Sequence, residues 1–219
     1  MLPQETKSIR SHFERQVQEI QGDVYRMGAL VEQSYRLAHT ALFSKDLSAV
    51  NTLIAHDKQI DQYYRKIEVH CLQLIALQSP VANDLRLIGA LMQLVRDLER
   101  IGDYAEDLGE IAVKLFPYPV PAYMPEIEQM FSLCQEMLVL SLSALTHLDA
   151  KSGLQVKIED DAVDRNYAEL YEILAHQPVP PSSVEPLLLA MLVIRALERM
   201  ADHATNIGVR VAFIVTGQR

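Results

Sequence analysis

Paired acidic side chains at helical spacing are the residues of this sequence best suited to chemistry. Glu99 and Asp103 stand four residues apart, and Glu198 and Asp202 repeat that spacing in the second half of the chain. On a helix, residues four apart share one face with Cβ atoms about 6 Å apart, so like charges there repel each other. A bound cation would remove the repulsion, and carboxylate oxygens suit hard or borderline divalent and trivalent metals. The spacing therefore favours metal binding.

An Asp-x-x-x-Asp pair precedes each Glu-x-x-x-Asp pair on an earlier predicted helix. If the two helices run side by side in each half, their acidic pairs meet across the groove between them. A solvated helix face is the alternative explanation of any single pair, but four pairs at matched places favour a selected role. We predict two metal sites, formed by Asp57, Asp61, Glu99, Asp103 and Asp107 and by Asp160, Asp164, Glu198, Asp202 and Asn206.

The acidic pairs belong to an internal repeat. The segment from Arg96 to Asp107 returns as the segment from Arg195 to Asn206, and apolar positions also match on two earlier predicted helices. Apolar residues recur at helical spacing almost throughout, and no run alternates as a strand would. Breaks at residues 44–46, 79–80, 116–125, 151–153 and 177–183 divide the chain into six helices. We predict an all-α fold of two tandem, antiparallel three-helix bundles.

Prolines mark the expected boundary between the bundles. Four prolines within residues 117–125 cannot continue a helix and favour an extended connector. We predict a first bundle over residues 1–116 and a second over residues 126–219. Ser79 is predicted to cap the third helix, with Pro80 at its first position, and Ser182 or Ser183 to cap the sixth.

Composition limits the classes of partner and compartment. At a net charge of −9, the chain lacks the concentration of Lys and Arg that nucleic-acid phosphates require. Cys71 and Cys134 lie on apolar stripes of separate halves, so we expect two buried free thiols and a reducing compartment. The first residues do not have the pattern of a signal peptide, and the longest apolar run, residues 187–194, is too short to cross a bilayer. We therefore expect a cytoplasmic protein.

These motifs resemble those of the PhoU phosphate-transport regulators, a family marked by paired Glu/Asp-x-x-x-Asp motifs in two tandem three-helix bundles. The matching stretches are residues 99–105 and 198–207, and the opening of the third predicted helix, residues 80–86, also resembles the family pattern. The second half departs from it, because no equivalent of Asp84 to Arg86 follows its prolines. The likeness covers nearly the whole chain.

The resemblance implies a non-enzymatic, cytoplasmic and peripheral regulator with iron or zinc on the acidic sites. Such a protein would link the ATPase subunit of a phosphate ABC transporter to a sensor histidine kinase, and would restrain the phosphate-starvation response when phosphate is plentiful. We also expect a homodimer. Arg86, Arg100 and Arg199 are candidate contacts to acidic partner surfaces, with pairing to neighbouring carboxylates as the alternative.

Three other classes of protein share some of these sequence features. A carboxylate-bridged di-iron enzyme needs inward Glu-x-x-His pairs, and none of the seven histidines stands three residues after an acid. A metal-dependent phosphohydrolase is suggested only by the dipeptide His56-Asp57, which is a weak signal. A helical adaptor without metal remains the third alternative, in which the acids serve solubility or partner binding alone.

Overall fold

The computed structural model describes residues 3–178 and 183–218, with side chains from residue 12 onward. All regular structure in these residues is helical, which confirms the predicted all-α class. The six helices are α1 (Pro3–Phe43), α2 (Ser48–Gln78), α3 (Ala82–Leu115), α4 (Met124–His147), α5 (Ala150–Ala175) and α6 (Glu185–Thr216).

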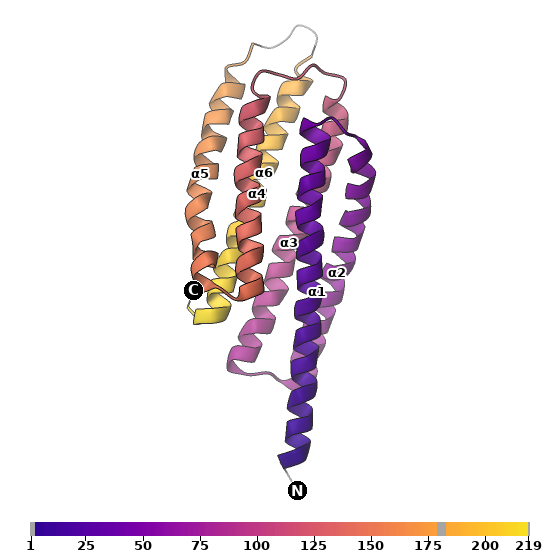
Figure 1. Ribbon diagram of the computed structural model, residues 1–219, viewed down its shortest axis with the longest axis vertical. Helices are drawn as coiled ribbons and strands as arrows, with labels where there is room; N and C mark the ends of the chain where they lie inside the picture. The colour runs from indigo at the N-terminus through magenta and orange to yellow at the C-terminus, as the bar shows by residue number, and fades with distance from the viewer. Residues whose placement is uncertain (1–2, 179–182, 219) are drawn as a thin grey trace.

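The helices form two antiparallel bundles that lie side by side (Figure 1). Helices α1 to α3 make the first bundle and α4 to α6 the second, with α3 packed along α6 and a smaller contact between α1 and α4. The apolar core is continuous across both bundles. At the α1–α4 contact, the hydroxyl of Tyr35 donates a hydrogen bond to the carbonyl oxygen of Phe131 at 2.8 Å, and their ring centroids are 4.3 Å apart. The predicted tandem arrangement is therefore confirmed.

The ends of the helices differ from the sequence prediction at more than one turn. The break predicted at residues 151–153 lies inside α5; the turn before α5 is formed by Leu148 and Asp149, and the carboxylate of Asp149 accepts the N–H groups of Lys151 and Ser152.

Ser79 does not cap α3; it ends α2 in the left-handed conformation, with φ 46° and its N–H on the carbonyl of Ile75. Pro80 disfavours the helical conformation in Ser79, the residue before it, so α2 ends at Gln78. Pro80 itself lies outside both helices. At α6, the cap position is taken by Val184 rather than by the predicted serine, although the hydroxyl of Ser183 accepts the N–H of Glu185 at 3.1 Å. Ser182 lies outside the described residues.

Small residues let the acid-bearing helices approach closely. In the second bundle Gly153 of α5 faces Gly208 of α6, and a Cβ added to Gly153 would lie 2.5 Å from the carbonyl oxygen of Gly208. In the first bundle a Cβ on Gly102 would lie 3.0 Å from Ile60. Because Gly102 stands between Glu99 and Asp103 in the chain, the close crossing brings α2 next to the acidic pair of α3.

Both cysteines lie in the core of the protein. Cys71 and Cys134 are both buried and unpaired, as expected. Across residues 3–178 and 183–218, none of the helices combines the length and the apolar character needed to span a bilayer.

Candidate metal centres

The first bundle brings the acidic pairs of α2 and α3 together. Asp57 and Asp61 on α2 lie close enough to Glu99 and Asp103 on α3 to raise the pKa of both through charge repulsion. Partial burial of the carboxyl groups is the larger cause of each shift. For Asp103, burial and the repulsion, chiefly by Glu99, raise the pKa to about 6 against the usual 3.8. The cluster thus takes up a proton more readily than isolated carboxylates do, and in its ionised form it would favour a cation.

Two further acids extend this cluster along α3. Burial, Asp61 and Asp107 all raise the pKa of Asp57, which places Asp107 within electrostatic reach of α2. Glu106 was not predicted, yet burial and the neighbouring Asp57 raise its pKa as well. The sequence reasoning considered only spacings of four; Glu106 stands three residues after Asp103, a spacing that also shares a helix face.

The second bundle repeats the arrangement. Burial raises the pKa of Asp160 to about 6, assisted by Asp164 on the same helix and Asp202 on α6. Burial, Asp202 and Asp164 raise the pKa of Glu198. The hydroxyl of Thr205 lies near Asp160 and opposes the rise, although it makes no hydrogen bond of normal geometry. Four of the five predicted residues therefore gather here.

Asn206, the fifth predicted residue, is turned elsewhere. Its Nδ2 donates a hydrogen bond to Oδ1 of Asp97 on α3, at 3.3 Å. The amide is thus engaged at the interface between the bundles. Helical spacing from Asp202 placed Asn206 on the right helix but could not reveal that a carboxylate of the other bundle stands nearer.

Arginines pair with some of the acids of both clusters. Arg100 lies 3.3 Å from Glu99 and 2.9 Å from Asp103, and Arg199 makes the corresponding contacts in the second bundle at 3.5 and 3.0 Å. The side chains of Arg100 and Arg199 are nevertheless 46% and 43% exposed. Both arginines thus pair with neighbouring carboxylates of their own chain.

The third candidate arginine has a different position. The guanidinium group of Arg86 bonds Asn83 at 3.0 Å and packs over Gly217, where α6 ends with φ 73°. A Cβ on Gly217 would collide with Nη1 of Arg86. A cation at this point also interacts favourably with the negative, carboxyl-terminal end of the α6 dipole. Arg86 therefore links the start of α3 to the end of α6.

The residues of the two clusters fit a metal in the chemistry of their donor atoms, but their side chains are not arranged around an ion. Among the described residues, no three Asp, Glu, His or Cys side chains surround one ion-sized position. The donors are carboxylate oxygens, as hard and borderline metals require. Oε2 of Glu99 is buried and accepts no hydrogen bond, since its contact with Arg100 lacks hydrogen-bond geometry. An unsatisfied buried anion of this kind is what a cation would stabilise.

The dipeptide His56-Asp57 does not form a unit. His56 is buried, with Nδ1 3.2 Å from the hydroxyl of Ser34 on α1, and burial lowers its pKa. Asp57 instead belongs to the acidic cluster between α2 and α3. The phosphohydrolase alternative thus loses the metal-binding pair on which it rested.

A buried carboxylate joins the two bundles and was missed by the sequence reasoning. Asp97 on α3 is 5% exposed and lies 2.9 Å from Nδ1 of His203, 3.3 Å from the amide of Asn206 and 2.9 Å from Nε of Arg210, all on α6. The repeat has Ala196 at the corresponding place. A charged residue where the repeat has an apolar one was the signal that could have identified this contact.

These features define a class: a tandem-repeat helical protein with one acidic cluster in each bundle. The family model for the PhoU domain matches residues 24–112 and 127–211, one match in each bundle. The chain belongs to the PhoU family.

The relatives describe what members of the family do. The phosphate-specific transport system accessory protein PhoU homolog of Synechocystis sp. is 55% identical over 210 residues, covering 96% of this chain and 94% of the relative. The crystal structure of PhoU from Pseudomonas aeruginosa superposes with a TM-score of 0.90 at 33% identity, covering 94% of this chain and 100% of that one. The phosphate transport system regulatory protein PhoU from Streptococcus pneumoniae gives 0.86 at 28% identity, over 94% and 98%. These names describe accessory and regulatory proteins, so the family is not one of enzymes.

The raised pKa values predict how stability depends on pH. Because the pKa of Asp103 and of Asp160 is about 6 in the folded chain and near 3.8 when unfolded, the folded state binds more protons between these values. In metal-free protein this contribution to stability is present below about pH 4 and is lost as the pH rises through about 6. Asp103→Asn and Asp160→Asn should each stabilise the chain at pH 7 by about 1 kcal/mol or less, since solvent screens both groups. Urea unfolding with chelator at pH 5, 6 and 7 measures this; a variant that follows the parent at every pH contradicts it.

Proposed function

We propose that this chain is a cytoplasmic, metal-binding adaptor of a phosphate transport system. The observation that carries the proposal is the pair of matched acidic clusters, each built from two helices and each with a carboxyl pKa near 6. The printed names of the relatives support the transport system as its setting. Its proposed partners are the ATPase subunit of a phosphate ABC transporter and a sensor histidine kinase, reached as a homodimer.

In this proposal, the first site is held by Asp57, Asp61, Glu99, Asp103 and Asp107, and the second by Asp160, Asp164, Glu198 and Asp202. A bound iron or zinc ion would supply positive charge that offsets the repulsion between the carboxylates. The carboxylates keep α2 against α3 and α5 against α6 by sharing that charge.

The arginines connect the acidic sites to the partner surface. In the structure, Arg100 and Arg199 supply positive charge to the clusters, and each contacts two carboxylates. A guanidinium group held by these carboxylates has fewer donors left for the acids of a partner. We infer that the two uses compete, so that the state of each cluster controls how far its arginine is available to a partner.

Metal analysis tests the central part of this function. Protein purified without chelators is expected to contain iron or zinc in amounts stoichiometric with the chain. Asp103→Asn should empty the first site and Asp202→Asn the second, because each change removes a charged ligand from a site that two helices form together. Inductively coupled plasma mass spectrometry measures the metal content. Binding should also weaken below about pH 6, where Asp103 and Asp160 take up protons.

Glu136→Gln is the matched control, because Glu136 is an exposed acid of α4 outside both clusters. Its metal content should equal that of the parent. The same proteins are then used to recover partners from membranes of phosphate-replete cells. A parent chain free of metal would remove the sites from the proposal, and recovery of neither the ATPase subunit nor a sensor kinase would contradict the adaptor role.

A further inference from the structure

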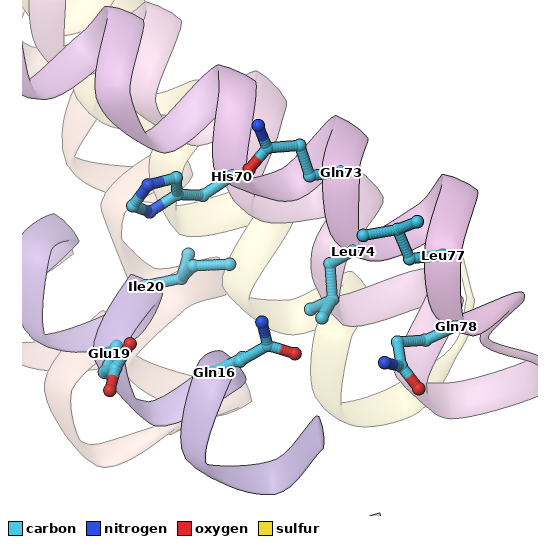
Figure 2. A pocket seen from close by; sticks show the side chains of 8 residues that line it. All are labelled: Gln16, Glu19, Ile20, His70, Gln73, Leu74, Leu77 and Gln78. Carbon is cyan, nitrogen blue, oxygen red and sulfur yellow. The ribbon is translucent and has the colours of Figure 1, made fainter. Parts of the chain in front are cut away.

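A groove runs between the amino-terminal half of α1 and the carboxyl-terminal half of α2. Two adjoining hollows of about 210 and 450 Å³ form it, and Glu19 and His70 line both (Figure 2 shows the smaller one). The second bundle has less room for such a groove, because α4 has 24 residues against 41 in α1 and α5 has 26 against 31 in α2. The groove therefore belongs to a part of the first bundle that the repeat does not duplicate.

One end of the groove is basic. Arg26 and Lys66 line the larger hollow together with Arg15. Arg26 and Lys66 both bind the buried carboxylate of Asp23, at 2.9 and 2.7 Å, while their side chains stay 64% and 50% exposed. Arg15, Arg26 and Lys66 in this lining outnumber its two carboxylates, Asp23 and Glu19, by one, so a net positive charge remains.

The other end is apolar and carries unused amide groups. Its apolar side chains are Ile20, Leu74 and Leu77. Leu77 is 78% exposed at the rim. Three amides surround them, from Gln16, Gln73 and Gln78 (Figure 2). None has a hydrogen-bond partner within the described chain, and Oε1 of Gln16 is buried as well. Unpaired amides beside an apolar surface are suited to the backbone of a bound chain.

We propose that this groove binds an extended segment of a partner protein, with an acidic side chain at one end and an apolar side chain at the other. The acid binds the exposed donors of Arg26 and Lys66, and the apolar side chain packs on Ile20 and Leu74. The amides of the groove bind the N–H and C=O groups of the segment between them, as in other modes of extended-peptide recognition.

The size and chemistry of the groove favour this occupant over others. From Arg15 to Arg26 the helix α1 rises about 16 Å, which corresponds to about five residues of extended chain. A helical segment satisfies its own backbone groups and would leave the amides unused. A free anion would fill only the basic end. The inference deepens the proposed adaptor function and rests on it for the identity of the partner.

Peptide selection tests the proposal on the purified full chain. Random seven-residue peptides displayed on phage are selected, and a fluorescein-labelled copy of the most enriched peptide is titrated by fluorescence polarisation. We expect enriched peptides to carry Asp or Glu three to five residues from Leu, Ile or Phe. The double variant Gln73→Ala/Gln78→Ala should raise the Kd by about tenfold, which is the effect of losing one or two hydrogen bonds. Lys66→Met should raise it similarly. Gln129→Ala, an exposed amide of α4, should leave it unchanged.

Three results would overturn the proposal: no enriched motif, an enriched motif that is basic, or equal binding to the parent and the double glutamine variant. Inorganic phosphate is titrated as a competitor; complete displacement at millimolar phosphate would indicate an anion site alone and also overturn it. The double variant changes only amides without partners, so its fold is expected to persist. All titrations are run with chelator, so failure of the groove is distinguishable from failure of the metal sites.

Discussion

Asp97→Ala is expected to destabilise the chain by about 3 kcal/mol or more. Loss of the carboxylate leaves His203 and Arg210 without their shared acceptor at a position where the side chain of Asp97 is 8% exposed. Removing one partner of a buried ion pair typically costs about 3–5 kcal/mol, because the remaining charge stays desolvated. Arg210 is itself 28% exposed, which places the expected value at the lower end. Urea unfolding followed by circular dichroism measures the change.

Two variants control for the loss of charge and of volume. Glu169→Ala removes an exposed acid from α5 and should change stability by less than about 0.5 kcal/mol. Asp97→Asn keeps the shape of the side chain and one acceptor oxygen. Its loss of stability should therefore fall between those of Asp97→Ala and Glu169→Ala. Because Asp97 joins α3 to α6, Asp97→Ala should also make unfolding less cooperative, with a lower m-value. A loss below about 1 kcal/mol would contradict the role given to this contact.

The architecture was predictable because its signals are local and repeated. Apolar spacing marked each helix, and the acidic pairs marked the same point in both bundles. The prediction that Ser79 caps α3 was wrong because the dipeptide Ser-Pro is compatible with both the start and the end of a helix. Serine is a common cap and proline a common first residue, and only the left-handed φ of Ser79 shows which applies.

The contents of the sites were less predictable, because side chains respond to neighbours distant in sequence. Spacing on α3 and α6 located Asp103 and Asp202, yet it could not show that Asn206 faces Asp97 of the other bundle. Nor could it show that Arg26 and Lys66 share Asp23 across α1 and α2. Such contacts follow from the packing of helices, which no single periodic pattern encodes.

Gly208→Val tests the packing that brings the second acidic cluster together. The carbonyl oxygen of Gly153 on α5 occupies the space a side chain would need, and Cβ of Val156 would lie 3.1 Å from the new Cβ. Since backbone rather than a flexible side chain must move, the loss should reach or exceed about 3 kcal/mol, the upper end for overpacking. The change should also separate α5 from α6, so, if the proposed metal sites exist, the metal content of the second should fall while the first keeps its own.

Gly89→Ala is the matched control, because no atom lies within 4 Å of its added Cβ. This change in the interior of α3 should stabilise the chain by up to about 1 kcal/mol through helix propensity alone. Thermal unfolding of both variants gives the comparison, and metal analysis of Gly208→Val gives the second readout. If Gly208→Val unfolds like the parent, then α5 and α6 can separate without loss, and close approach at this crossing is not what holds Asp160 near Asp202.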